Sequence, residues 1–334
     1  MPFIDNIVKY GSCSIVGMAK NCGKTVVLNH ILSSLHNRTT QVAVTSIGVD
    51  GEKVDSITLT AKPEIILDKG TFFATSEGYY NQRRLISEII DSTEYWSPLG
   101  KIVIGRVLEK GKIIISGPSD TYSTKMLINH FHRIGANLIL VDGALSRKTT
   151  ASPIITDSLI LCTGAALSIN MEELIRQTTF THRLISLNLI EENTLKCDLE
   201  RIETGVWGIS GGKELSKVAD SVFDLKEKLP DILKRFSRIY LAGMLTSNIL
   251  ESIMANATSV EIVVQDFTKI FTSSPVFNKF TKQGGQIKVL RKAELIAVCI
   301  NPVSPTGHVL YSEELADRLQ QRLEIGVYDV KKIC

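Results

Sequence analysis

The chain lacks the features that would mark a membrane protein, a secreted protein or a binder of polyanions. Its 334 residues include 38 Lys or Arg and 35 Asp or Glu, a net charge of +3 that is too near balance to predict a nucleic-acid or membrane surface. No run approaches the roughly 18 apolar residues of a membrane span, and the N-terminal MPFIDNIVKYGS has no apolar stretch typical of a secretion signal. We therefore expect a cytoplasmic protein with no nucleic-acid and no membrane partner.

Paired cysteines and zinc-type motifs are also missing from the sequence. The six cysteines are spread along the chain without a C-x-x-C pair, and the six histidines show no HExxH spacing. A chain of this length does not need disulfides to fold. We expect reduced thiols and no structural metal ion.

The sequence does contain short β-branched runs that alternate with helical patterns. This alternation predicts an α/β fold with a mostly parallel sheet flanked by helices, of the kind found in P-loop NTPases. We expect strands near 13–16, 41–46, 138–142 and 158–163, and helices near 25–35, 82–90, 124–134 and 171–187. Two further runs, 101–108 and 112–116, are joined by a glycine-containing turn at 109–111 and predict a β-hairpin.

The same patterns predict two domains. We expect a P-loop NTPase-like domain over 1–195, with a β-hairpin insertion near 63–117, and a smaller C-terminal α/β domain over 196–334. The glycines Gly211 and Gly212 favour a boundary near this point. Within the second domain, strands are expected near 238–241, 260–264, 295–300 and 326–330, and helices near 248–255 and 312–322.

The motif with the clearest chemistry is GMAKNCGKT, which spans 17–25 between an apolar strand and an amphipathic helix. Backbone N–H groups at a helix N-terminus attract phosphate, Gly23 permits close backbone approach, Lys24 reaches the β- and γ-phosphates, and the Thr25 hydroxyl can bind Mg²⁺. We assign the nucleotide site to Gly17, Asn21, Cys22, Gly23, Lys24 and Thr25. The nucleotide is ATP by default, because no N-K-x-D guanine-reading motif is present. The alternative is a GKT that only turns a strand into a helix.

Two details of this loop depart from the usual pattern. Five residues separate Gly17 from Gly23, where G-x-x-x-x-G-K-[ST] has four, and Met18 stands where the first glycine would fall. Cys22 could be a thiolate in this electropositive setting, but a small neutral filler is the interpretation that we favour.

Carboxylates for Mg²⁺ are expected at the ends of neighbouring strands. Asp142 ends the apolar run LILVD, and Asp50 follows the strand that contains Thr45. We assign Lys24, Asp50 and Asp142 to catalysis, Thr25, Asp50 and Asp142 to the metal, and Thr45 to nucleotide contact. The alternatives are a helix cap or turn for Asp142 and simple Asp-Gly turn chemistry for Asp50.

Three other polar residues, Asp120, Arg147 and Lys148, each have two alternative roles. Asp120 could reach the site or only cap the helix that follows it. Arg147 and Lys148 could contact phosphate or the acidic groups of a partner.

The loop with five intervening residues resembles that of dethiobiotin synthetase and its relatives among the dimerising P-loop NTPases, and the VDGA segment at 141–144 resembles their V-E-G-A-G-G. This resemblance implies a possible homodimer. Several relatives carry a second lysine five positions before the loop lysine, but here that position is Ala19. We assign no catalytic role to the neighbouring Lys20.

Longer strings, SIVGMAKNCGKTVVLNHIL, TSIGVDGEKVD, ISGPSD, VDGALSRKTTASPIITDSLILCTGAALS and INPVSPTG, are similar to the reactivase subunits of lysine 5,6-aminomutase. The resemblance runs over nearly the whole chain. It implies an adenosylcobalamin- and pyridoxal-phosphate-dependent lysine 5,6-aminomutase as partner, a MutS-like ATPase companion subunit, and exchange of damaged cobalamin with ATP and Mg²⁺.

Three classes of function follow from these residues and resemblances. The first is a nucleotide-dependent reactivating or chaperone subunit. The second is an ATP-dependent ligase of the dethiobiotin synthetase type, acting on a small amine or carboxylate, and the third is a nucleotide-binding scaffold that does not hydrolyse. The sequence favours the first, because the altered VDGAL segment offers no obvious pocket for a small substrate.

Overall fold

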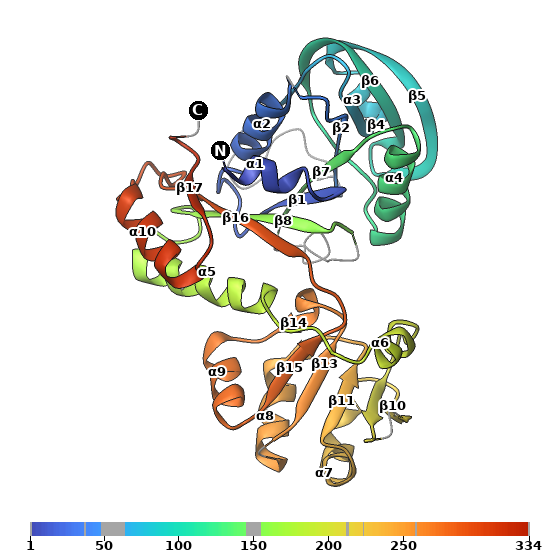
Figure 1. The fold of residues 1–334 in the computed structure, drawn as a ribbon, viewed down its shortest axis with the longest axis vertical. Helices are drawn as coiled ribbons and strands as arrows, with labels where there is room; N and C mark the ends of the chain where they lie inside the picture. The colour runs from blue at the N-terminus through green and yellow to red at the C-terminus, as the bar shows by residue number, and fades with distance from the viewer. Residues whose placement is uncertain are drawn as a thin grey trace. The chain divides into compact units, whose positions relative to one another are not determined.

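A ten-stranded, mostly parallel β-sheet organises the part of the chain that contains the GKT motif, as the computed structural model in Figure 1 shows. The structure describes residues 2–36, 38–47, 64–144, 155–211, 214–222, 224–257 and 259–332. The chain divides into unit 1, residues 1–179 and 293–334, and unit 2, residues 180–292. No helix in these described residues is long and apolar enough to cross a membrane.

The sheet of unit 1 has the strand order β17-β16-β8-β1-β7-β2-β4-β6-β3, with β5 paired to β6. Its strands are β1 (Ser12–Gly17), β2 (Val42–Ser46), β3 (Ile65–Leu67), β4 (Phe72–Ser76), β5 (Arg84–Ser97), β6 (Gly100–Ile113), β7 (Leu138–Ala144), β8 (Ser158–Gly164), β16 (Glu294–Asn301) and β17 (Val327–Asp329). Every neighbouring pair from β17 to β4 is parallel, whereas β6 is antiparallel to β3, β4 and β5. The predicted α/β class, with a large mostly parallel sheet, is therefore confirmed.

The helices of unit 1 are α1 (Pro2–Ile7), α2 (Lys24–Leu35), α3 (Glu77–Tyr80), α4 (Thr121–Arg133), α5 (Met171–Ile185) and α10 (Ser312–Leu323). Helices α2 and α4 bury apolar stripes against opposite faces of the sheet. Val27 and Ile31 of α2 belong to a core that includes Leu140 of β7, whereas Phe131 of α4 packs with the adjacent Val141. Successive residues of a strand point to opposite faces, so β7 lies between two cores.

The predicted hairpin insertion exists, but its details were wrong. The expected helix over 82–90 is part of strand β5, and the expected turn at 109–111 lies inside β6. The chain turns instead at 98–99, before Gly100, whose φ of 102° is readily adopted by glycine. Glycine at position 111 allows β5 and β6 to approach closely, because a Cβ there would lie 2.1 Å from the Arg84 carbonyl oxygen. In Figure 1, β5 and β6 form a long curved ribbon at the edge of the sheet.

The predicted domain boundary at 195/196 also differs from the structure. Residues 293–334 return to unit 1, where β16 pairs with β8 and β17 pairs with β16 (Figure 1). The first boundary of unit 2 falls between Thr179 and Phe180, inside α5. Unit 2 is therefore an insertion in unit 1 and not a C-terminal domain.

Unit 2 has a sheet of its own with the order β10-β9-β11-β13-β15. Its elements are α6 (Asn193–Glu200), β9 (Val206–Ile209), β10 (Leu215–Ala219), α7 (Leu225–Arg235), β11 (Arg238–Leu241), α8 (Ser247–Asn256), β13 (Glu261–Val264), the 3-10 helix η2 (Phe267–Lys269), α9 (Ser274–Lys282) and β15 (Gln286–Val289), with β12 (Leu245–Thr246) paired to β14 (Ile270–Phe271). Strands β11, β13 and β15 are parallel, and β9 runs antiparallel to both β10 and β11. The expectation of a smaller α/β body is confirmed for this segment.

Candidate phosphate-binding site

The candidate site lies at the edge of the unit 1 sheet where the parallel strands end. Gly17, the last residue of β1, is paired in register with Ala144 of β7 and Cys162 of β8. Asn301, the last residue of β16, is paired with Gly164. The carboxyl ends of parallel strands are where open α/β sheets bind ligands, so the motif stands at the expected edge.

Gly17 and Lys24 are packed directly against each other. A Cβ built on Gly17 would lie 2.7 Å from Cys22 Sγ, 2.9 Å from Lys24 Cδ and 3.0 Å from Lys24 Nζ. The side chain of Lys24 therefore folds back from the start of α2 over the end of β1. Only glycine leaves room for this arrangement, which places the ammonium group of Lys24 within the loop.

The backbone between Gly17 and α2 contains two residues in the left-handed region. Asn21 and Gly23 both have positive φ, at 61° and 92°. Gly23 is the N-cap of α2 and, as a glycine, has no side chain that could cap the helix. Uncapped N–H groups and the helix dipole together favour an anion at this point. Thr25 is half-buried in the first turn of the same helix.

Neighbouring strands hold the loop in place. The Met18 N–H donates to the Cys162 carbonyl at 2.9 Å, and Asn301 Nδ2 donates to the Asn21 carbonyl at 2.9 Å. A Cβ at Gly23 would lie 3.2 Å from a methyl group of Val330. The loop is thus fixed from β8, β16 and the segment after β17. Sequence reasoning gave Asn301 no role, because its position at the end of an apolar strand indicates the edge of the sheet but not the contact with Asn21.

Cys22 fills the space under the loop as a neutral thiol, as the sequence analysis favoured. Its side chain is fully buried and its Sγ donates to the Ala19 carbonyl at 2.8 Å. Burial raises the pKa of the Cys22 thiol to about 11, and the nearby Lys24 lowers it only in part. A thiolate nucleophile at this position is therefore disfavoured. Cys13, Cys22, Cys162, Cys197 and Cys299, the described cysteines, are all free.

Asp142 lies on the same face of the sheet as α2. Residues two apart on a strand point to the same face of the sheet, and Leu138 and Leu140 belong to the core beneath α2. Asp142 is the next residue in this series. The residue is half-buried, and its register partners are Ile15 of β1 and Ser46 of β2. Asp142 thus occupies the strand next to the loop, two residues before β7 ends.

Lys24 and Asp142 both act electrostatically on the buried Cys162 thiol. The pKa of this thiol is raised, first by its hydrogen bond with Cys299 and then by burial; Lys24 lowers the pKa and Asp142 raises it. Two opposite charges that influence one thiol lie near the same point of the structure. The structure therefore brings the predicted phosphate lysine and the predicted metal carboxylate to one region.

Other predicted residues have mixed outcomes. Thr45 is fully buried in β2, and its hydroxyl has no hydrogen-bond partner among the described residues. Asp120 accepts a hydrogen bond from the Ser123 N–H at 2.8 Å, which confirms the helix-cap alternative. Asp50, Arg147 and Lys148 lie outside the described residues.

The described residues of the protein supply few candidate ligands for a magnesium ion at this edge of the sheet. Within the described ranges, no three His, Cys, Asp or Glu side chains converge on one point as a protein-only metal cage. Mg²⁺ usually keeps waters and binds one or two carboxylates together with substrate phosphates. One hydroxyl, from Thr25, and one carboxylate, from Asp142, match that donor set.

The comparisons with known proteins add no family assignment to this geometry. Neither the family models nor the curated proteins nor the solved structures yielded a match to this chain.

Proposed function

We propose that unit 1 binds and hydrolyses ATP with Mg²⁺, and that the loop between β1 and α2 holds the phosphates. The observation that carries this proposal is the packing of Lys24 over Gly17, with Nζ 3.0 Å from the position of a Cβ. This packing places a positive charge beside the start of α2, where the N-cap residue is a glycine. A helix N-terminus and a lysine that converge on one point form a site for a polyphosphate.

Each residue of the site has a separate task in this proposal. Lys24 binds β- and γ-phosphate oxygens, and the first N–H groups of α2 bind the same anion. Thr25 and Asp142 hold the ion, and Mg²⁺ supplies positive charge to the phosphate oxygens. Asp50 is proposed to orient the attacking water, which is a role assigned from the sequence alone.

Titration with a fluorescent ATP analogue tests the nucleotide site. Lys24→Ala should weaken binding by about tenfold to a hundredfold, because a hydrogen bond to a charged group contributes about 1.5–3 kcal/mol. The matched control is Lys20→Ala, which removes the same charge from an exposed position in the same loop. If Lys24→Ala binds the ATP analogue as tightly as Lys20→Ala and the parent chain do, and its circular dichroism is unchanged, the proposed nucleotide site is wrong.

We also propose that the nucleotide cycle drives reactivation of an adenosylcobalamin-dependent lysine 5,6-aminomutase, together with a MutS-like companion subunit. The support for this client is the resemblance of the sequence strings, whereas the support for the switch is the geometry around Lys24. A nucleotide can drive a partner only if its bound states differ in affinity for that partner. ATP must therefore change how tightly this chain binds the aminomutase.

The decisive experiment starts from suicide-inactivated aminomutase, to which the chain, its companion, fresh adenosylcobalamin, ATP and Mg²⁺ are added. Activity should return with the parent chain and with Lys20→Ala, but not with Lys24→Ala. Equal recovery without the chain would exclude the reactivase function while leaving nucleotide binding intact. ATP consumption stimulated by a small amine or carboxylate would favour the ligase instead.

A further inference from the structure

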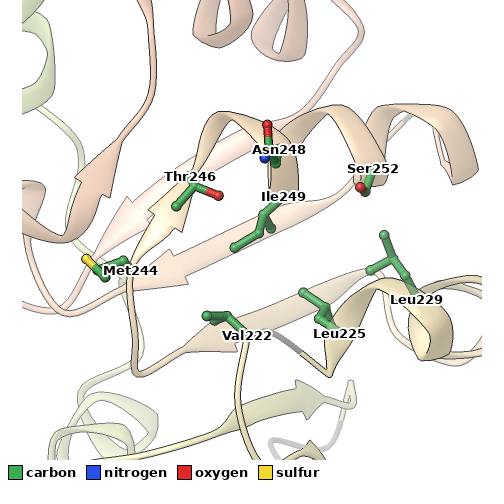
Figure 2. Close-up of a pocket in the computed structure, with 8 residues that line it drawn as sticks. All are labelled: Val222, Leu225, Leu229, Met244, Thr246, Asn248, Ile249 and Ser252. Carbon is green, nitrogen blue, oxygen red and sulfur yellow. The ribbon is translucent and has the colours of Figure 1, made fainter.

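Unit 2 contains a cavity of about 330 Å³ whose lining shows two different walls (Figure 2). One wall comes from the segment after β10 and from α7; the other comes from the segment after β11 and from α8. The lining residues are Val222, Leu225, Leu229, Met244, Thr246, Asn248, Ile249 and Ser252. This volume lies within the range of small-molecule sites in proteins.

The cavity occupies a position where sheets of this type bind ligands. Val206 of β9 is paired with Ala219, the last residue of β10, and also with Leu241, the last residue of β11. Strands β10 and β11 therefore run in the same direction and end at the same edge. The segments that leave these two carboxyl ends form the cavity, which is the location that open α/β sheets favour for ligands.

The described residues of the α7 wall are apolar. Leu225 and Leu229 are buried on α7, and Val222 precedes that helix. A Cβ on Gly243, which follows β11, would lie 3.5 Å from a methyl group of Val222, so this valine reaches across to the opposite segment. In Figure 2, Ile249 points from α8 toward this wall. A ligand in the cavity would contact apolar side chains on this side.

The α8 wall offers hydrogen bonds. The side chains of Thr246, Asn248 and Ser252 line the cavity, and none of them bonds to another described residue. Thr246 is the N-cap of α8, yet its hydroxyl does not cap the helix. Unused hydroxyl and amide groups on one wall can bind the polar edge of a ligand, whereas none of the eight lining residues carries an ionisable group that would pair with a charge.

We infer that unit 2 binds a small uncharged molecule with a flat or branched apolar face and a hydrogen-bonding edge. The apolar face packs on Leu225 and Leu229, and the polar edge bonds to Thr246 and its neighbours on α8. A charged ligand is selected against, because the eight described lining residues include no group of opposite charge to pair with it. This site does not depend on the proposed function of unit 1.

The test uses the full chain with isotope-labelled Ile, Leu and Met methyl groups, observed by NMR. The probes are p-cresol, which has an apolar ring and one hydroxyl and is neutral at pH 7, toluene, which lacks the hydroxyl, and benzoate, which is charged. We expect saturable shifts at the methyl groups of Leu225, Leu229, Met244 and Ile249. Binding should be several-fold tighter for p-cresol than for toluene and at least tenfold weaker for benzoate.

Variants separate this cavity from general surface binding. Ile249→Trp fills the cavity, and Ser252→Phe fills it from another position; each should abolish the saturable shifts of the remaining methyl groups. Glu251→Trp, at an exposed position of the same helix, is the control and should change nothing. Thr246→Val should remove the advantage of p-cresol over toluene. Shifts that do not saturate, that survive in both filled variants, or that are equal for benzoate would overturn the proposal.

Discussion

Substitution of Gly17 by alanine should damage the candidate phosphate site in two ways that can be measured separately. The new Cβ would lie 2.7 Å from Cys22 Sγ, almost 1 Å closer than the roughly 3.5 Å at which heavy atoms pack well. It would also lie 2.9 Å from Lys24 Cδ and 3.0 Å from Lys24 Nζ. Lys24 is long and flexible and can swing away, whereas Cys22 is buried and cannot.

The magnitudes follow from these two contacts. Overpacking against the buried Cys22 should lower the free energy of unfolding by about 1–3 kcal/mol. Displacement of Lys24 should weaken ATP binding at least tenfold, because the ammonium group leaves the loop. Urea denaturation measures the first effect, and titration with a fluorescent ATP analogue measures the second.

A double variant distinguishes the two contacts. In a Cys22→Ala background the sulfur atom is gone, so Gly17→Ala should cost less stability than it does in the parent chain. The loss of nucleotide affinity should remain, since the contact with Lys24 is unchanged. Gly211→Ala is the control, because a Cβ there meets nothing within 4 Å. If Gly17→Ala retains both parental stability and parental affinity, the packing of Lys24 over Gly17 is not what forms the site.

Three further substitutions test other parts of the structure. Asp142→Asn should weaken the Mg²⁺ dependence of ATP hydrolysis more than it weakens nucleotide binding; overlapping Mg²⁺ titrations of variant and parent would contradict the metal role. Asn301→Ala removes the hydrogen bond to the Asn21 carbonyl and should lower the free energy of unfolding by about 1 kcal/mol and ATP affinity a few-fold, measured by denaturation and titration. In unit 2, the Arg238 guanidinium, which donates to Glu192 at 2.7 and 3.0 Å, lowers the pKa of Glu192 from 4.5 to about 2. The pair therefore stabilises the fold above about pH 4.5 and loses this contribution as the pH falls through about 2. Glu192→Gln should cost about 1 kcal/mol at pH 7 in urea denaturation, since the carboxylate is about a third exposed and screened, and almost nothing well below pH 2. A pH-independent difference would contradict this assignment.

The sequence predicted the elements around the candidate site because their signals are local. The apolar run before Gly17, the three-and-four spacing of α2 and the run that ends at Asp142 each lie within a few residues of one another, and all three elements formed close to where they were expected. The position of Lys24 in the loop could be predicted for the same reason. The hydrogen bond from Asn301 to the loop could not be predicted, because it joins residues far apart in the chain.

Two errors show where local patterns fail. Apolar residues in β5 fall at Leu85, Ile86, Ile89 and Ile90, which imitates the spacing of a helix, because bulges interrupt the strand alternation at several points. The glycine at 111 was interpreted as a turn residue, although it is needed for close approach of Arg84. Pairing partners decide both cases, and the return of β16 to β8 likewise depends on pairing that periodicity does not encode.

The insertion of unit 2 has a consequence for the order in which the chain can fold during synthesis. The loop from Gly17 to Lys24 leaves the ribosome well before Asn301 and Val330, which pack against it. Segment 180–292 is continuous and emerges in one piece between them, so it can fold while the sheet of unit 1 still lacks β16 and β17. A nascent chain that has not reached residue 301 holds the whole GKT motif without the side chains that fix its shape.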